Sequence, residues 1–579
     1  MIAATVVFAY LAVVLYVGIF AFRRSTASTE DFFLANRSLG TVVFLLSLFG
    51  SNMTSFAILG SSGLAFRVGI GVFGLMASIS AIVIPLTILI IGTRIWALGK
   101  RFGHVTQVQI FRDRWECGHI GTVIFALQAV MLVPYIIIGV MGGGETLEGV
   151  SSGQVPYWLG GLIVALVVMG YVFFGGMRGT AWVNTLQTSM FLVFGTLALL
   201  VIAHGLGGLS PLVARLAETL QHPPPPPARP DGELLTRARL APGYYFSYMF
   251  IPLSSIMFPH IAIFCLTAKR MASFRKTVIF YPLCILAIWL PAVFLGALAG
   301  GRLDLVSSLA TKSAGFEQLR KSDPAGAALI EDVAAGRVPL DDPRAAPLRA
   351  GPLKAEARRL AGTQADGIML DLLARFAPAL LAGILGAAIM ACVMASDSQI
   401  LALSTMWAED VFAFYGGKRR FGDAAQIWSA RAFVVLLTVL AYAIAVAVRG
   451  SANIFEIAIQ YAFSGYASMA PIMLACLFWR RSTKWGALAA TLWVAACLVG
   501  SGVLQAMTPV PREAGAAVPL WSWNGTPILL REAVRISFTS QRFLLVLPMI
   551  VGSSLLMWLG SVLTTPPSAA TLRRYFPEG

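Results

Sequence analysis

One carboxylate in this sequence could do chemistry because it lies inside a hydrophobic run. Asp397 occurs in the segment Met394-Ala395-Ser396-Asp397-Ser398-Gln399, within the long apolar stretch 372–406. A carboxylate that faced lipid would be costly, so such a group normally faces the protein interior or water and has a function. It could bind a cation or exchange a proton. In the alternative interpretation the helix is already leaving the membrane, and Asp397 is solvated or bonded to Ser398.

Two other apolar runs contain residues that interrupt a helix. The run 41–66 includes Gly50-Ser51-Asn52-Met53-Thr54-Ser55, and the run 244–267 includes Pro252, Ser254-Ser255 and Phe258-Pro259-His260. Gly and Pro weaken the helical hydrogen-bond ladder, and the backbone groups that they free need new partners. Helices broken in this way form solute and ion sites in membrane transporters. A single break has a simpler explanation, because Gly and Pro are common in ordinary membrane helices.

Other reactive side chains do not predict a second site. His260 follows the proline of the second break and could carry a proton, but a neutral histidine bonded to a freed carbonyl is the favoured interpretation. The six cysteines show neither a CxxC pattern nor a Cys/His metal spacing, so we expect no disulfide framework and no metal site. No nucleophile–base pattern is present, so we do not expect an enzyme.

The elements that must position these residues are membrane helices. The chain has 579 residues, of which 58% are hydrophobic and 12% charged, against about 45–50% and about 25% in soluble domains. The apolar runs approach the ~20 residues that cross a hydrocarbon core and lack the two-residue alternation of a barrel, which predicts an all-α membrane protein. About 13 spans are predicted on a hydropathy window, near 2–22, 41–66, 70–98, 120–142, 156–176, 181–206, 244–267, 276–300, 372–406, 430–449, 453–478, 484–505 and 542–563.

The net charge of +16 lies mainly in short loops between these runs, as at Arg23-Arg24, Lys269-Arg270 and Lys418-Arg419-Arg420. The positive-inside rule places such loops in the cytoplasm. We therefore expect a multi-pass protein of the cell (inner) membrane, in contact with lipid, with its N-terminus outside and its C-terminus cytoplasmic. Charge located in this way argues against a nucleic-acid partner, which a basic soluble chain would suggest.

The two interrupted runs stand five spans apart, so corresponding segments run in opposite directions. This predicts two inverted five-helix repeats, at 41–206 and 244–478. An N-terminal transmembrane helix at 1–22 precedes them, and C-terminal transmembrane helices at 484–579 follow. Outer loops are expected at 207–243, where Pro223–Pro227 forms a polyproline spacer, at 301–371, as an insertion of short amphipathic helices, and at 507–541.

Asp31–Gly40, DFFLANRSLG, is similar to the stretch D-Y-F-L-A-G-R-S-L-G of the sodium:solute symporter family. Gly175-Gly176-Met177, followed by Asn184 and Gln187, resembles the signature G-G-[LM]…T-D-x-x-Q. The stretch 365–410 resembles the family's ninth helix, and 461–486 resembles its second signature. The resemblance covers about residues 28–486 and implies a LeuT-type fold with 13 helices.

The resemblance also implies a sodium site. Its carbonyl ligands fall at Gly50, Met53 and Ala391, but its two hydroxyl positions are Met394 and Ala395 here, and a signature aspartate is Asn184. Thioether sulfur is a soft ligand that a small hard cation does not prefer. We therefore expect weak sodium dependence, with Asp397, beside Ser398, as an alternative proton-coupling group. A sodium ion is the one cofactor that the resemblance suggests.

The implied function is secondary active transport of a small organic solute by alternating access. Family members that carry sugars have a glutamine at the position of Ala57, so an amino acid or carboxylate is favoured here. The alternative is a solute sensor or receptor that has the transporter fold but does not transport, and no oligomeric state is predicted. The expected solute-binding residues line the two breaks: Asn52, Thr54, Ser55, Phe56, Ala57, Ser254, Ser255 and Phe258.

Overall fold

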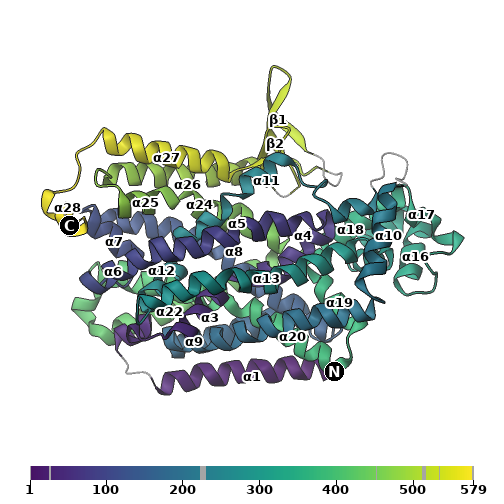
Figure 1. Ribbon diagram of the computed structural model, residues 1–579, viewed down its shortest axis with the longest axis horizontal. Coiled ribbons are helices and arrows are strands. Elements are labelled where there is room, and N and C mark those ends of the chain that lie inside the picture. The colour runs from purple at the N-terminus through teal and green to yellow at the C-terminus, as the bar shows by residue number, and fades with distance from the viewer. Residues whose placement is uncertain are drawn as a thin grey trace.

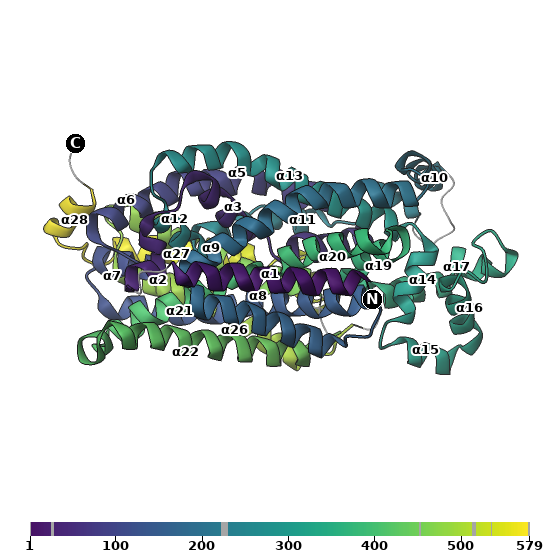
Figure 2. The same cartoon turned by 90° about the horizontal axis from the view of Figure 1, so that it is seen from below.

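A computed structural model describes residues 2–24, 28–221, 230–450, 453–511, 517–533 and 535–576, and it is a bundle of helices that run side by side (Figures 1 and 2). Among these residues, nine helical segments are long and apolar enough to cross a membrane, or up to eleven if two bent pairs each form a span. The predicted spacer Pro223–Pro227 lies outside the described residues. The nine segments are Ile2–Arg23 (α1), Gly71–Phe102 (α5, Gly71–Thr87, to α6, Thr93–Phe102), Gly118–Val150 (α8), Tyr157–Gly205 (α9), Ala272–Gly300 (α13), Ala379–Ala413, Gly417–Ala447 (α22), Ile454–Phe478 and Lys484–Met507 (α26).

The predicted number of about 13 separate spans is not reproduced. The predicted spans 156–176 and 181–206 both fall in α9, which has a kink where Gly176 adopts φ 51° and ψ −145°. A Cβ at Gly176 would lie 2.6 Å from the Phe32 carbonyl oxygen, so this kink requires glycine. The last predicted span, 542–563, corresponds to the shorter helix α27 (Val546–Val562).

Both interrupted runs form bent helix pairs. Helix α3 (Thr41–Asn52) is bent by 57° from the segment Phe56–Val68, which ends in α4 (Ser61–Val68). Met53, with φ −107° and ψ 89°, leaves the helical region at this break. The second pair bends by 43° between Pro242–Ile256, which contains α11 (Pro242–Tyr248), and α12 (Pro259–Thr267). Pro259 begins α12, where its missing N–H has no cost.

A close contact between helices places α9 beside the first break. A Cβ built on Gly50 would lie 2.1 Å from the Oγ1 atom of Thr188 on α9. Only glycine permits this approach of α3 to α9. Asn184, one helical turn before Thr188, is thereby held near the break.

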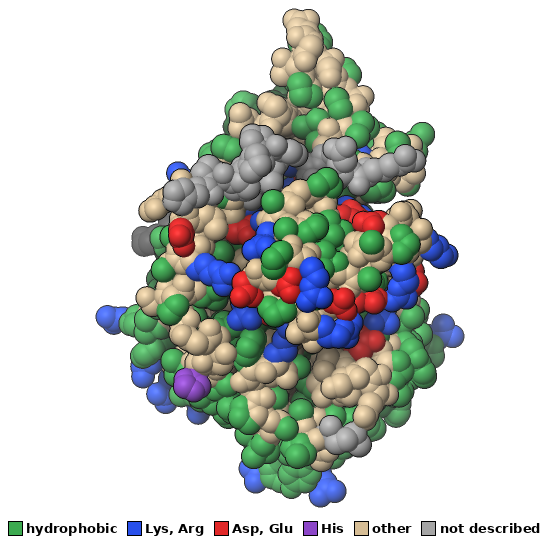
Figure 3. Space-filling model, turned by 90° about the vertical axis from the view of Figure 1, so that its right-hand side faces the viewer, with side chains coloured by type: hydrophobic (Ala, Val, Ile, Leu, Met, Phe, Trp, Pro, Cys, Tyr) green, Lys and Arg blue, Asp and Glu red, His purple; other side chains and the backbone are tan. Residues whose placement is uncertain are grey.

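The insertion 301–371 and its neighbours form a group of short helices at one end of the bundle, on the right in Figures 1 and 2. Acidic and basic side chains gather across this end of the molecule (Figure 3). Asp231, for example, pairs with Lys354 at 3.1 Å and with Arg358 at 2.8 Å. The helices are α10 (Leu209–Gln221), α14 (Leu303–Thr311), α15 (Phe316–Ser322), α16 (Pro324–Ala334), α17 (Ala346–Arg349), α18 (Pro352–Thr363) and α19 (Ile368–Phe376).

A small antiparallel sheet departs from the all-α prediction, although the chain is mostly helical. Its four strands are β1 (Val518–Trp523), β2 (Thr526–Arg531), β3 (Ile536–Phe538) and β4 (Phe543–Leu544), paired in chain order. Asn524 and Gly525 have φ of 47° and 75°, as a two-residue hairpin turn requires. An Asn-Gly pair between apolar residues is a recognised hairpin signal, and it was available in the predicted loop 507–541.

Candidate functional site

The carbonyl groups of the first break are bound by side chains from other helices. The donors lie on α8, on α20 (Ala379–Val393) and on α21 (Asp397–Met406). A broken helix inside a membrane needs such partners, because an unpaired backbone group there is costly. The bonds are Gln399 Nε2 to the Ser51 carbonyl at 2.8 Å, Tyr135 Oη to Asn52 at 3.0 Å, and Cys392 Sγ to Met53 and Thr54 at 3.3 and 3.2 Å.

These bonds occupy part of the sodium site that the resemblance implies. The Gly50 carbonyl accepts the Met53 N–H at 3.0 Å, and the Met53 carbonyl accepts the thiol of Cys392. Ala391 is buried next to this thiol, and Met394 and Ala395 are also buried. The structure therefore brings α3 and α20 together at this point, but Met394 and Ala395 supply no side-chain oxygen.

The carbonyl of Met257 at the second break accepts two amide donors, Gln107 Nε2 at 2.9 Å and Gln128 Nε2 at 3.2 Å. Both glutamines are buried, and sequence reasoning did not identify either. Gln128 lies in the apolar run 120–142. A polar amide side chain in such a run is the sequence feature that could have identified it. The two glutamines hold the second break between α7 (Gln107–Arg114) and α8.

Aromatic side chains connect the two breaks. Phe56 of the first break lies 4.9 Å from Phe463, measured between ring centroids, and Phe258 of the second lies 5.6 Å from the same ring. Tyr135 stacks on Phe258 at 5.6 Å and meets Phe463 at 5.0 Å. Phe56 and Phe258, both predicted to bind solute, thus face a shared aromatic cluster, whose members Tyr135 and Phe463 were not predicted.

Several other predicted solute ligands are engaged within the protein. Asn52 donates its amide to the Tyr281 hydroxyl at 2.9 Å, Ser55 donates to the Ile138 carbonyl at 2.7 Å, and Ser255 donates to the Pro252 carbonyl at 2.8 Å. The remaining predicted ligands are also buried: Thr54, Ala57 and Ser254. These predicted ligands are therefore shielded from solvent in this conformation.

Polar atoms without partners also lie near the second break. Neither ring nitrogen of His260 has a hydrogen-bond partner among the described residues, although the ring is buried 4.9 Å from Phe258. The expected bond from His260 to a freed carbonyl is not formed with any described residue. Within the same described part of the chain, the Oε1 atoms of Gln107 and Gln128 are likewise unpartnered. Buried polar atoms are normally satisfied, so this group of atoms needs an explanation.

Asp397 is completely buried, so the interpretation that it is solvated is wrong. The bond to Ser398 is present: Ser398 Oγ donates to Oδ1 at 2.9 Å. Tyr171 Oη also donates to Oδ2 at 3.0 Å, and Asn184 Nδ2 to Oδ1 at 3.3 Å. No described Lys or Arg forms an ion pair with this carboxylate. It is therefore a buried acid held by neutral donors.

Oxygen atoms gather around Asp397. Asn184 also donates to Ser398 Oγ at 2.8 Å, which leaves its own Oδ1 buried and without a partner among the described residues. The side chain of Gln187 faces the hydroxyl groups of Tyr10 and Tyr171. The family-signature positions Asn184 and Gln187 thus lie beside Asp397. The carboxylate and the hydroxyl oxygens of Tyr171 and Ser398 are hard ligands that suit a small cation, whereas Asn184 presents its amide nitrogen to Asp397.

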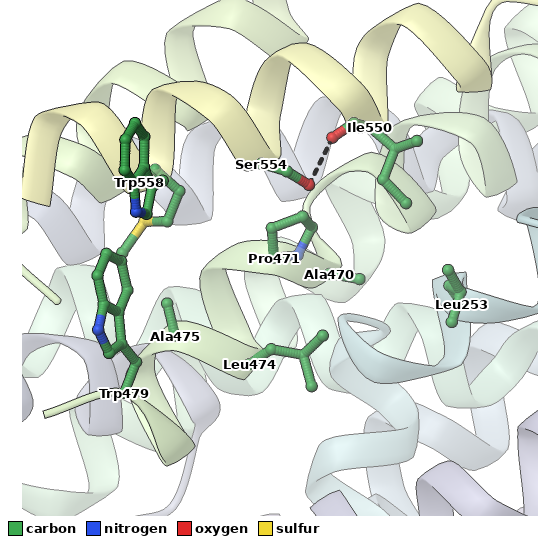
Figure 4. A pocket seen from close by; sticks show the side chains of 10 residues that line it. Leu253, Ala470, Pro471, Leu474, Ala475, Trp479, Ile550, Ser554 and Trp558 are labelled. Carbon is green, nitrogen blue, oxygen red and sulfur yellow. Dashed lines mark hydrogen bonds between the residues drawn. The ribbon is translucent and has the colours of Figure 1, made fainter.

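A groove of about 440 Å³ is lined by residues from the C-terminal half of the chain and by Leu253, which lies in the second interrupted run. Figure 4 shows it between α25 (Ala470–Phe478) and α27, with Trp479 and Trp558 at one end and Leu253 at the other. Its lining is almost entirely apolar, and the groove contains none of the residues predicted to bind the solute or the cation.

The family follows from comparison with known proteins. The model of the sodium:solute symporter family matches residues 32–332 and 352–493, which is more than half of the chain. The chain belongs to this family. In fold, this family member is similar to a solved Na⁺-coupled sialic acid symporter in a substrate-bound outward-open state, with a TM-score of 0.65, 13% identity, and coverage of 98% of this chain and 99% of that one. The predicted LeuT-type fold is confirmed.

Curated relatives of this chain differ in the share of their length that it matches. The Escherichia coli (strain K12) sodium/pantothenate symporter is 28% identical over 47% of this chain and 55% of its own length. For this and two further curated relatives, the chain spans about half of their length. The sodium/proline symporter of the same strain is 25% identical over 80% of this chain and 81% of its own, and the Bacillus subtilis (strain 168) uncharacterized symporter YwcA is 25% identical over 90% and 89%.

Asp366 contacts three elements at the end of the bundle where the insertion 301–371 lies. It lies in the turn Ala365–Gly367, and its Oδ2 accepts the N–H of Ile454 at 2.7 Å. A Cβ at Gly63 on α4 would lie 2.4 Å from its Oδ1. Burial raises the pKa of Asp366 to about 6, against the opposing effects of Arg67 and the Ile454 N–H and with a smaller contribution from Glu456. Glu145 of α8 also faces it.

The raised pKa of Asp366 predicts a pH-dependent stability. The folded protein keeps this proton up to about pH 6, whereas the unfolded chain releases it near pH 3.9, so the free energy of unfolding falls as pH rises from about 4 to about 6. Asp366→Asn should remove this fall, roughly 2–3 kcal/mol, and retain an acceptor for Ile454. Thermal unfolding in detergent across this pH range measures the difference from wild type. Exposed Asp341→Asn is the control, and parallel curves for Asp366→Asn and wild type would contradict the assignment.

Proposed function

We propose that this protein is a secondary active transporter that moves a small organic solute across the cell membrane together with a cation. The observation that carries the proposal is Asp397, a completely buried carboxylate with neutral donors and no described ion-pair partner. A buried acid of this kind is costly unless a proton or metal cation neutralises it. It lies on α21, whose Gln399 binds the first broken helix, and the preceding helix α20 binds the same break through Cys392. Occupancy of Asp397 can thus be coupled to the position of that helix.

Membership of the family supports sodium as the coupling ion. The residues at the implied sodium site are poor sodium ligands, which favours Asp397 as the coupling group. The carbonyl of Met53 is bound to Cys392, and Met394 and Ala395 provide no hydroxyl. The oxygens around Asp397 suit a sodium ion, and the carboxylate alone can take a proton. We therefore assign coupling to Asp397 with either ion. The orientation with the N-terminus outside and the C-terminus cytoplasmic is part of the proposal and rests on the basic loops.

The solute is a small molecule with polar groups and an apolar part. Phe56, Phe258 and Phe463 supply an aromatic wall, and His260 and two glutamines supply unpartnered polar atoms. Related proteins are named as symporters of pantothenate and of proline, both of which carry a carboxylate. An amino acid or another small carboxylate fits the same description.

Uptake into proteoliposomes tests the function. Labelled proline, pantothenate and simple monocarboxylates are offered with an inward gradient of sodium, of protons, or of neither. We expect one solute class to accumulate only when a cation gradient is present. Saturable binding without accumulation under every gradient would contradict transport and favour a sensor.

His260→Phe should separate solute binding from folding. The change keeps a ring against Phe258 and Tyr135 and removes two buried nitrogens that lack partners, so thermal stability should not fall. If the imidazole hydrogen-bonds the solute, the affinity should fall roughly tenfold. Concentration-dependent uptake and thermal unfolding are measured on the same preparation. Exposed His119→Phe is the control, and unchanged affinity in His260→Phe would exclude His260 from the solute site.

A further inference from the structure

The hairpin formed by β1 and β2 projects from the bundle. In Figure 1 it stands on the upper edge, crosswise to the helices, above the ends of α26 and α27. Its outer part has little contact with the rest of the protein: Trp521, Trp523 and Val518 are 54%, 63% and 41% exposed. The base of β2 is paired with β3 over Leu529–Arg531, so only the outer part of the hairpin is a two-stranded ribbon. Such a ribbon gains little stability from its own pairing in water, and contacts with its surroundings would add to it.

The composition of the hairpin indicates that this environment is not bulk water. Residues 518–530 include no Asp, Glu, Lys or Arg. Natural proteins usually protect an exposed edge strand such as β1 with charge, because an uncharged apolar edge promotes aggregation. β1 has a proline, Pro519, and two register irregularities instead of charge, together with two exposed tryptophans. The hairpin thus lacks the charges expected of a strand surrounded by water.

Charged residues begin at the base of the hairpin, where protein covers them. Arg535 pairs with Glu456 at 3.2 Å and with Glu532 at 2.8 Å, and its guanidinium lies 4.4 Å from the ring centroid of Tyr244. The N–H of Leu544, in β4, donates to Ser247 Oγ at 2.9 Å. Tyr244 and Ser247 belong to α11, so the base is attached to the outer half of the second broken helix.

The position of the hairpin along the bundle matches a membrane boundary. It lies in the connection between the end of α26 at Met507 and the start of α27 at Val546. Both helices expose apolar side chains, such as Val499 and Val503 on α26 and Val551 on α27. In Figure 1 the hairpin stands just beyond the right-hand ends of α26 and α27 and to the left of the short helices of the insertion. It is therefore not part of the charged end that Figure 3 shows.

We propose that the β1–β2 hairpin lies in the lipid headgroup region of the membrane leaflet at this end of the bundle, with Trp521 and Trp523 as its anchors. Tryptophan is enriched at this depth, because its ring is apolar while its N–H can still bond to water and headgroups. The unpaired backbone of β1 can also find partners there, whereas the hydrocarbon core offers none. Because the base of the hairpin contacts α11, this location would also hold the second broken helix near the membrane surface.

Fluorescence quenching by lipids tests this location. Ser522→Cys, between the two tryptophans, is labelled with an environment-sensitive nitrobenzoxadiazole dye after Cys117, Cys284 and Cys497 are replaced by alanine. The other three cysteines are buried. The matched control is Ser322→Cys, exposed on α15 in the charged insertion. Each protein is reconstituted into phosphatidylcholine vesicles with or without a spin label near the headgroup end of the acyl chain.

We expect spin-labelled lipid to reduce emission about twofold at position 522 and to leave position 322 unchanged. Aqueous iodide should quench position 322 more strongly. Replacing both tryptophans with serine should shift position 522 toward the behaviour of the control. If that variant does not fold, the dye at Thr526→Cys, on the facing strand, provides the same measurement.

Two results would overturn the proposal. Strong iodide quenching at position 522 without lipid quenching would place the hairpin in water. Protection from both quenchers, together with cross-linking between Ser522→Cys chains, would show that a second copy of the protein covers it. Neither result depends on transport, so the test is independent of the proposed function.

Discussion

Asp397→Asn should abolish most cation-dependent uptake while the protein still folds. The substitution is nearly isosteric, and its amide oxygen can still accept the hydrogen bond from Tyr171 that is 3.0 Å long in the wild type. It removes the negative charge that a cation or proton would neutralise. A contact with a charged group contributes about 1.5–3 kcal/mol, so cation-dependent uptake should fall by roughly 10- to 100-fold.

The measurement is uptake into proteoliposomes with sodium replaced by choline, at several pH values between 5.5 and 8.5. Wild-type uptake should depend on sodium or on pH, and that dependence should disappear in the variant. Asp371→Asn is the matched control, because this buried carboxylate is paired with Lys312 in the insertion group, whereas Asp397 is held by neutral donors. Strong sodium stimulation that survives Asp397→Asn would show that Gly50, Met53 and Ala391 hold sodium without the missing hydroxyls.

Arg112→Met should cause the largest loss of stability. Asp410 is completely buried, and Arg112 is its ion-pair partner, with Nη1 3.2 Å from Oδ1 and Nη2 2.7 Å from the Asp410 carbonyl. Thr106 provides one further hydrogen bond to the carboxylate, at 2.8 Å. Removing one partner of a buried pair leaves an uncompensated charge, at a cost of about 3–5 kcal/mol. Thermal unfolding in detergent measures this change.

The double variant Arg112→Met with Asp410→Asn identifies the cause. Because it removes both charges, it should recover a large part of the lost stability. Arg320→Met, at an exposed pair with Glu317, is the control and should change stability by less than about 1 kcal/mol. A double variant no more stable than Arg112→Met would instead assign the loss to other Arg112 contacts, such as the Gly118 carbonyl or the Phe414 ring.

The sequence by itself determined which segments are buried in the membrane and where helices break. A hydrophobic run indicates a segment that avoids water, and the glycine and proline residues at 50–63 and 252–259 indicate where a helix is interrupted. Both features depend only on neighbouring residues in the sequence. The need of Asp397 for partners inside the protein was also visible, because a carboxylate in an apolar run needs a partner whatever the fold. The Asn-Gly turn of the β1–β2 hairpin was equally visible but was not used.

Only the tertiary structure decided which groups meet. Tyr171 and Asp397 are 226 residues apart, and Cys392 donates to a carbonyl 339 residues away. Such pairs depend on how closely helices approach, as Gly50 permits between α3 and α9, and side-chain hydrogen bonds across helices leave no periodic pattern in the sequence. The engagement of Asn52 and Ser55 within the protein, the unpartnered nitrogens of His260 and the position of the hairpin were decided in the same way. Composition and periodicity determine burial, whereas the partners of a buried polar group are set by the packing of distant segments.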